Sequence, residues 1–248
     1  MKQLLKTVSD TEKQLRIDQV VLGLGYIAVE LEDSRVGLSA NIADTSMSGC
    51  SVFSRAGSLK GSSVAEILDL GVQDNLLSRA IALAAVNAVS NTAGLAPGVD
   101  VFERMAVQSG EHVAMVGFIA PVAQMLKKAG AEVSVFEKRT LESAVIRPET
   151  EMALAFAEAD IIILSATTII NNTIYELLTL PNTARDVILM GPSTPMIPDV
   201  FISTPVTYLA GSAVTDGRKA LQIVMEGGGT QVLYRADAMK KIHQEVHQ

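Results

Sequence analysis

Glycine, hydroxyl and amide residues recur directly after apolar runs in the second half of the chain, where backbone amides and short side chains suit a small polar ligand. In an open parallel sheet such positions share one edge, because ligands bind outside the carboxyl ends of the strands. Ordinary turn chemistry is the alternative, since the same residue types dominate turns. We favour a ligand site, with candidate contacts Gly117, Phe118, Thr167, Thr168, Asn171, Gly191, Ser193, Thr194 and Gly211.

Two further candidates are Glu137 and Asn87. Gly117 opens a strand–turn–helix–strand unit that ends in Glu137, and an acidic residue at that distance accepts hydrogen bonds from ribose hydroxyls in dinucleotide folds. The full glycine fingerprint is missing, because Phe118 and Ile119 replace small residues, so a standard NAD or FAD site is not expected. A solvated carboxylate is the alternative for Glu137. Asn87 lies in an apolar helix, where its amide needs a partner.

The sequence assigns no metal ligand and no catalytic residue. Cys50 is the only cysteine, so one chain cannot build a thiolate cage. Of the histidines, His112 stands alone, and His243 and His247 belong to a charged C-terminal tail that we expect to be exposed rather than to chelate a metal on a helix face. No nucleophile-elbow or zinc-protease motif occurs.

Two polar segments near the C-terminus each have two interpretations. Asp216 and Arg218 follow the last predicted strand, where Asp216 caps the next helix or contacts a ligand, and we favour capping. The glycines of Gly227–Gly229 allow a loop to close over a ligand or simply end a helix, and the sequence does not separate these two.

The second half alternates short apolar runs with helical segments. Because the runs are continuously apolar, they predict parallel strands covered on both faces, in a doubly wound, Rossmann-like α/β domain over residues 99–248. The predicted strands are Val113–Val116, Glu132–Phe136, Asp160–Leu164, Val187–Met190 and Val206–Leu209, and the helices Val122–Ala129, Glu149–Ala159, Thr173–Leu180 and Thr215–Met225.

The first half predicts a smaller α+β domain over residues 1–98. A helical start at Met1–Arg16 precedes a hairpin formed by Ile17–Leu31 and Val36–Ala40. The elements that follow are an irregular loop at Asp44–Gly61, a capping box at Ser63–Glu66, a buried helix at Leu76–Val89 and a linker at Gly94–Gly98.

Composition narrows the function classes. The chain has 248 residues, 48% of them hydrophobic and 19% charged, with a net charge of −7. Abundant apolar residues exclude disorder, and the acidic balance argues against a nucleic-acid binder. Apolar runs such as Ile161–Leu164 fall far short of the ~20 residues of a membrane span. With one cysteine and no signal-peptide pattern, we expect a cytoplasmic protein whose partner is a small molecule.

Four sequence blocks together resemble a known family: Val116–Pro121, Thr167–Thr173, Met190–Pro195 and Glu226–Thr230 look like those of the putative heavy-metal chelation domain family. The first half, with Gly25–Glu30 and Val36–Leu38, is similar to that family's enolase N-terminal-like domain. The resemblance covers nearly the whole chain and implies a cleft between two domains and a role in handling metal. Since the chain is poor in soft ligands, we expect any divalent metal to arrive inside an organic chelate or on oxygen ligands.

Three functions remain open. The first is a cytosolic protein that binds or processes a small anionic metabolite or metal-bearing chelate in the cleft. The second is a Rossmann-type enzyme, a transferase or lyase, with a nucleotide-like cofactor on Glu137 and with Glu226 or Asp216 as acid or base. The third is an assembly module whose apolar excess forms a homo-oligomer interface.

Overall fold

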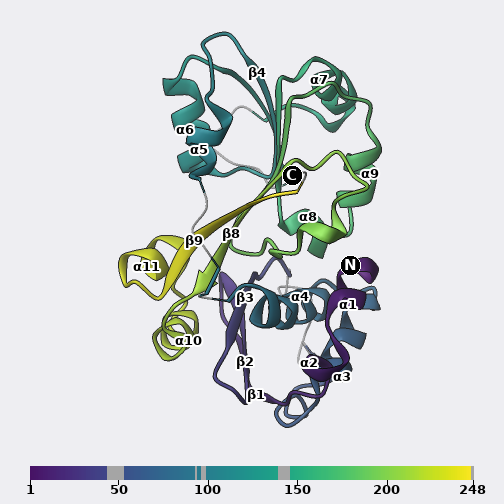
Figure 1. The fold of residues 1–248 in the computed structure, drawn as a ribbon, viewed down its shortest axis with the longest axis vertical. Helices are drawn as coiled ribbons and strands as arrows, with labels where there is room; N and C mark the ends of the chain where they lie inside the picture. The colour runs from purple at the N-terminus through teal and green to yellow at the C-terminus, as the bar shows by residue number, and fades with distance from the viewer. Residues whose placement is uncertain (44–52, 93, 96–98, 139–145, 247–248) are drawn as a thin grey trace.

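The computed structural model describes residues 1–43, 53–92, 94–95, 99–138 and 146–246 (Figure 1). An antiparallel sheet near the N-terminus contains β1 (Ile17–Leu22), β2 (Tyr26–Leu31) and β3 (Val36–Ala40) in that order. The β2–β3 hairpin is the one expected from the sequence. The apolar run before it divides into two strands, because the chain turns at Gly23–Gly25, where the Gly23 N–H donates to the Tyr26 carbonyl.

A second sheet has the order β5-β4-β6-β7-β8-β9, in which β9 alone runs antiparallel to its neighbour. The chain passes from β4 to β5 on one side and then to β6 on the other, so the topological switch point lies between β4 and β6. The predicted α/β class with a parallel sheet is therefore confirmed. The strands are β4 (His112–Val116), β5 (Glu132–Phe136), β6 (Ile161–Ser165), β7 (Asp186–Met190), β8 (Tyr208–Val214) and β9 (Met239–Glu245).

Helices connect and cover both sheets. Helix α3 begins with the expected capping box, in which the Ser63 hydroxyl accepts from the Glu66 N–H and the Glu66 carboxylate accepts from the Ser63 N–H. The helices are α1 (Lys2–Thr7), α2 (Asp10–Lys13), α3 (Val64–Leu68), α4 (Leu76–Ser90), α5 (Val101–Met105), α6 (Ala120–Lys128), α7 (Met152–Glu158), α8 (Thr167–Ile170), α9 (Ile174–Thr179), α10 (Gly217–Met225) and α11 (Thr230–Arg235), with 3₁₀ turns at Asp69–Val72, Glu149–Glu151 and Pro198–Val200.

Helix α4 lies at the centre of the molecule, as its all-round apolar sequence predicts. It packs on β2 and β3, and the cluster that contains it includes Ile162 and Leu164 of the large sheet. A side chain at Gly37 of β3 would collide with the α4 backbone at Ala84 and Ala88, so glycine allows this close approach. The two sheets thus share one core, with the small sheet and α4 in the lower part of Figure 1.

The small sheet is covered on both faces. Its second face, with Tyr26, Ala28 and Val36, packs against Leu221 and Val224 of α10, which comes from the far end of the chain. The large sheet likewise has apolar clusters on both faces, with Ile162 and Leu164 on one and Ile161 and Ile163 on the other. This double coverage explains why its strands are continuously apolar.

The C-terminal segment corrects the sequence prediction. Residues expected as an exposed tail form β9, which pairs with β8, and the exposed fraction of His243 is 7%. His243 lies on a strand and not on a helix, and His247 is outside the described residues. The burial of β9 does not alternate, since Met239, Ile242 and His243 are buried and Lys241 and Glu245 are exposed, so the sequence lacks the period-two signal of a half-buried strand.

Other differences are smaller. The last parallel strand was predicted at 206–209 but spans Tyr208–Val214, so Gly211 lies inside β8 and not in the turn after it. Helices α5, α8 and α11 were not predicted, because each has six residues or fewer. Part of the predicted Asp44–Gly61 loop (44–52) and most of the linker (96–98) lie outside the described residues.

Candidate functional site

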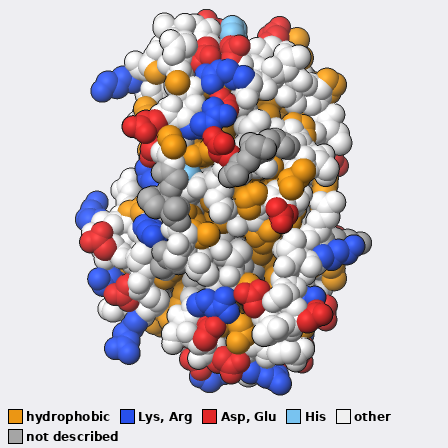
Figure 2. All heavy atoms as spheres, viewed as in Figure 1, with side chains coloured by type: hydrophobic (Ala, Val, Ile, Leu, Met, Phe, Trp, Pro, Cys, Tyr) orange, Lys and Arg blue, Asp and Glu red, His pale blue; other side chains and the backbone are white. Residues whose placement is uncertain are grey.

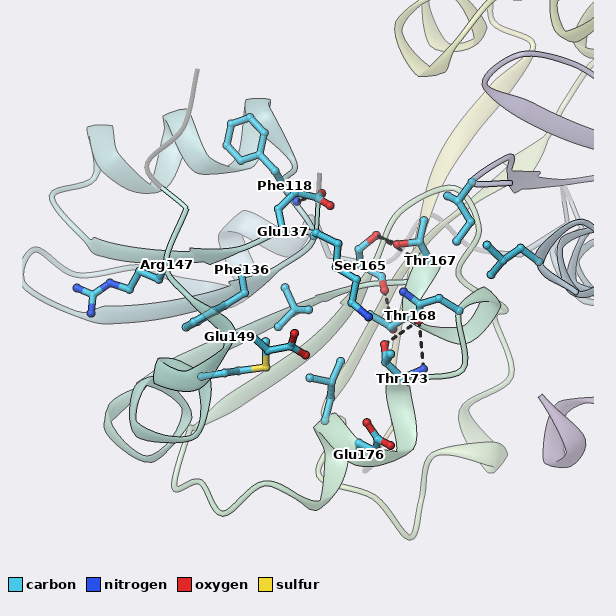
Figure 3. Close-up of a pocket in the computed structure, with 18 residues that line it drawn as sticks. Phe118, Phe136, Glu137, Arg147, Glu149, Ser165, Thr167, Thr168, Thr173 and Glu176 are labelled. Carbon is cyan, nitrogen blue, oxygen red and sulfur yellow. Dashed lines mark hydrogen bonds between the residues drawn. The ribbon is translucent and has the colours of Figure 1, made fainter. Parts of the chain in front are cut away.

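A cavity of about 360 Å³ lies at the carboxyl ends of β4, β5 and β6, where an open α/β sheet offers its ligand crevice (Figure 3). On the face shown in Figure 2, apolar side chains gather where the two halves of the molecule meet. The cavity is lined by Ile42 and Leu76 from the first half and by Val116, Gly117, Phe118, Phe136, Glu137, Lys138, Arg147, Glu149, Met152, Ser165, Thr167, Thr168, Asn171, Thr173, Glu176 and Leu177 from the second.

Hydroxyl groups on and around α8 form one wall of this cavity. The Ser165 and Thr167 hydroxyls lie 2.9 Å apart, and the Thr168 hydroxyl donates to the Ser165 carbonyl at 2.7 Å. The Asn171 side-chain oxygen accepts from both the N–H and the hydroxyl of Thr173, at 3.1 and 2.7 Å. These internal bonds fix the direction of each group, so the wall is pre-organised for a ligand.

Gly117 allows β4 and β6 to approach each other beside the cavity. Its φ of +83° favours glycine, and a Cβ there would lie 2.6 Å from the Ser165 Cβ. On the other side of the turn, the Phe118 N–H donates to the Glu137 carboxylate at 3.2 Å. Glu137 is half-buried, and its carboxylate holds the turn after β4 in place while it lines the cavity.

Charged side chains at this cavity carry more negative than positive charge. Glu137, Glu149 and Glu176 contribute carboxylates, while Lys138 and Arg147 contribute cations. The Arg147 guanidinium lies 3.3 Å from the Glu151 carboxylate, which offsets part of its charge. Among the described lining residues, three carboxylates thus stand against two cations.

A second cavity of about 640 Å³ lies between the two halves and shares Phe118, Ser165 and Thr167 with the first. It faces the ends of β2 and β3 and the start of α11. Its remaining lining residues are Tyr26, Ala40, Ile119, Ala120, Pro121, Ala166, Met190, Gly191, Pro192, Ser193, Gly229, Thr230, Gln231 and Val232.

Two buried asparagines, Asn87 on α4 and Asn91 at the C-cap of that helix, join the two halves of the molecule. Asn87 donates to the carbonyls of Leu38 and Ser193, at 2.8 and 3.1 Å. One helical turn later, Asn91 donates to the carbonyls of Thr194 and Ser212. The sequence analysis did not select Asn91, although its four-residue spacing from Asn87 on an apolar helix was the available signal.

The serine and threonine after β7 also make internal bonds. The Ser193 hydroxyl accepts from the Ala40 N–H at 2.7 Å, and the fully buried Thr194 hydroxyl donates to the Ala210 carbonyl. Backbone amides behave similarly, because Gly117 donates to Phe136 and Gly191 donates to Ala210. The expected row of exposed N–H groups is thus engaged within the protein at these positions, which leaves side chains to meet a ligand.

The structure divides the sequence candidates into three groups. The first cavity brings together Gly117, Phe118, Glu137, Thr167, Thr168 and Asn171, and the second adds Gly191 and Ser193. Asn87, Thr194 and Gly211 line neither cavity. Sequence reasoning missed Glu149, which begins a 3₁₀ turn, and Glu176, which lies within α9. Acidic residues are common at such exposed helical positions, so neither residue stood out.

The donors in the first cavity do not suit a bare soft metal ion. Among the described residues, no group of three or more His, Cys, Asp or Glu side chains is placed to hold a metal. His112 lies at the start of β4, at the opposite end of the strand from the cavity. The cavity offers carboxylate, hydroxyl and amide oxygens, which suit hard cations, and the thioether of Met152.

Comparisons with known proteins agree with this architecture. Two family models, both described as "Putative heavy-metal chelation", match the chain: DUF364 over residues 100–242 and DUF4213 over residues 5–90. An uncharacterized protein of Methanocaldococcus jannaschii is 29% identical over 187 residues, which are 73% of this chain and 71% of the relative.

No helix within the described part of the chain has the length and apolarity needed to cross a bilayer.

Solved structures share the whole fold. A DUF364 protein of unknown function from Desulfitobacterium hafniense has a TM-score of 0.80 and 22% identity, over 98% of this chain and 96% of that one. Another, from Pyrococcus horikoshii, has a TM-score of 0.77 and 24% identity, over 98% of both chains.

Proposed function

The chain belongs to the "Putative heavy-metal chelation" family, and we propose that it binds a small organic molecule that carries a metal ion, in the cavity at the carboxyl ends of β4, β5 and β6. The observation that carries the proposal is the chemistry of this cavity. It combines apolar walls, a fixed row of hydroxyls and an excess of carboxylates, and no cluster of metal ligands occurs among the described residues.

Each part of the cavity has a role in this proposal. Phe136, Met152 and Leu177 pack against the carbon skeleton of the organic molecule, and the hydroxyls of Ser165 and Thr167 meet its polar edge. Glu149 and Glu176 face the metal, either at open coordination positions or through its bound water. Since the organic molecule already supplies most ligands, the protein needs no cage of its own.

Charge decides between the ligand classes considered for the cavity. A multiply charged anionic metabolite would be repelled by Glu137, Glu149 and Glu176, whereas a neutral or positively charged metal complex gains from them. We therefore propose the metal-bearing complex rather than an anionic metabolite. The enzyme interpretation is not proposed, since no arrangement in the cavity supports a particular reaction.

Native mass spectrometry and elemental analysis of the same purified sample test this function. The protein is unfolded, refolded in chelator and incubated with the small-molecule fraction of a cell extract before it is re-isolated. We expect an added mass below about 1,000 Da, as suits a cavity of this size class. We also expect a metal released together with that mass on unfolding.

A matched pair of variants locates the site. Glu176→Gln removes a carboxylate from the cavity, and we expect the retained metal and organic mass to fall together by about tenfold, the worth of one charge-assisted contact. Glu158→Gln makes the same change on α7 outside the cavity and should leave retention unchanged. Metal retained without any organic mass, or a protein that captures neither, contradicts the proposal.

A further inference from the structure

The second cavity differs from the first in electrostatic character. None of its described lining residues is an aspartate, glutamate, lysine, arginine or histidine, although its volume of about 640 Å³ falls within the range of small-molecule sites. The first cavity, by contrast, has five charged side chains among its lining. The two cavities meet at Phe118, Ser165 and Thr167.

Three hydroxyl groups at the second cavity already have partners. The Tyr26 hydroxyl lies 2.7 Å from the Thr230 hydroxyl, and the Ser193 hydroxyl accepts from the Ala40 N–H. Burial raises the pKa of Tyr26 above its usual value, although the hydrogen bond to Thr230 opposes the rise, so the phenol stays uncharged at neutral pH. The lining therefore offers no opposite charge to a charged ligand.

The larger apolar side chains of the lining come from three separate segments. Phe118 and Pro121 lie at the start of α6, Met190 ends β7, and Val232 lies on α11. These side chains supply flat and branched apolar surface, while hydroxyls remain at the junction with the first cavity. Burying an unpaired charge here would be costly, whereas burying an uncharged ring is favourable.

We propose that the second cavity is a distinct subsite that binds an uncharged, ring-bearing organic group. The inference deepens the proposed function, on which it rests for the identity of the whole ligand: the metal-bearing part occupies the charged cavity, and an uncharged ring of the same molecule reaches past Ser165 and Thr167 into the second one. The start of α11, after Gly227–Gly229, belongs to this subsite, because residues 229–232 line it.

A pair of fluorescent probes tests the subsite without knowledge of the natural ligand. N-phenylnaphthylamine is uncharged, and anilinonaphthalenesulfonate has the same rings with an added sulfonate. We expect the uncharged probe to bind the intact protein at one site per chain, and the sulfonate to bind at least about tenfold more weakly, because its charge meets no partner. Equal affinities, or tighter binding of the sulfonate, overturn the proposal.

Substitutions at one lining residue test whether the uncharged probe binds in the second cavity. Val232→Trp fills the cavity from a side chain that is already 44% exposed, so we expect loss of the uncharged probe without unfolding. Val72→Trp makes the same change at a 56% exposed position outside both cavities and should have no effect. An unchanged affinity in Val232→Trp, or equal losses in both variants, refutes the assignment.

A positive charge added to the subsite gives a second, independent readout. Val232→Lys places a cation at the subsite, and we expect tighter binding of the sulfonate by several-fold, which Val72→Lys should not produce. Glu158→Gln, which removes a carboxylate outside both cavities, should leave both probes unaffected. Failure of the metal-retention experiment with these probe results intact would refute the proposed function but not the uncharged character of the subsite.

Discussion

Single residues at this site act mainly by holding backbone segments together. Asn87 and Asn91 each donate two hydrogen bonds from α4 to carbonyls outside that helix, and the Ser193 hydroxyl closes another contact to β3. The Asn87 side-chain oxygen has no hydrogen-bond partner among the described residues. Buried amides of this kind stabilise one geometry, because breaking them leaves carbonyls unpaired.

Gly117 provides a prediction at the residue scale. Gly117→Ala combines a left-handed backbone, which costs roughly 1–2 kcal/mol, with a clash against Ser165 that costs roughly 1–3 kcal/mol more. Gly110 has a similar φ of +86° but open space where its Cβ would lie, so Gly110→Ala carries only the backbone cost. Urea unfolding of both variants measures the difference, and equal losses would show that the clash relaxes freely.

The burial of most elements follows from the pattern of apolar residues in their own sequences. Helix α4 is apolar all round, strands β6 and β7 are apolar on both faces, and both patterns correspond to nearly complete burial. Strand β9 is the exception, because its burial depends on pairing with β8 and not on its own composition.

At the amino end of the sheet, the carboxylate of Asp186 is buried between the guanidiniums of Arg104 and Arg185.

The burial of His243 on β9 predicts a pH dependence at the element scale. Burial lowers the pKa of His243 below its unfolded value of 6.5, with hydrogen bonding to the Val99 backbone and the charge of Asp100 opposing. Below that unfolded value the unfolded chain binds the proton more readily than the folded one. The free energy of unfolding contributed by His243 is therefore present in full above about pH 6.5 and is lost as the pH falls toward the folded pKa.

Denaturation at several pH values between about 7 and 5 measures this loss. His243→Gln should flatten the pH dependence, because the buried titrating group is removed. His112→Gln replaces an exposed histidine whose side-chain exposed fraction is 52%, and it should retain the wild-type slope. A slope that survives in His243→Gln would assign the pH dependence to other groups.

The whole molecule is organised around the small sheet, which has α4 on one face and α10 on the other. Residues 1–98 lack α10, so on their own they would expose Tyr26, Ala28, Val36 and Leu38. The domain boundary inferred from the sequence therefore separates two segments that complete each other's cores. Both cavities are lined by residues from both halves, so the contacts that join the halves also shape the cavities.

Shared packing predicts a single unfolding transition for the whole chain. We expect far-UV circular dichroism and hydrogen exchange of the β2 amides to report the same midpoint in urea. Leu221→Ala on α10 should lower that midpoint, with a cost of roughly 2–5 kcal/mol for a buried leucine, and should accelerate exchange in β2. Met225→Ala, at a 56% exposed side chain on the same helix, should change neither. Two separate transitions would instead indicate independent domains.

The sequence by itself determined the class of the large sheet, the buried helix α4, the capping box of α3 and the edge of the sheet where small polar residues meet. These features follow from local chemistry, since periodicity, capping and the residues after each strand depend on near neighbours. The same reasoning brought Gly117, Thr167, Thr168 and Asn171 to one cavity.

Only the tertiary structure decided what those residues do. It assigned Glu137 to the Phe118 amide, placed Gly211 within a strand, buried His243, and divided the candidate region into one charged and one uncharged cavity. Several of these outcomes depend on partners elsewhere in the chain: β9 pairs with β8 around Gly211 and His243, and the start of α11 lines the second cavity. Such pairings have no local signature, because they arise when the two halves pack together.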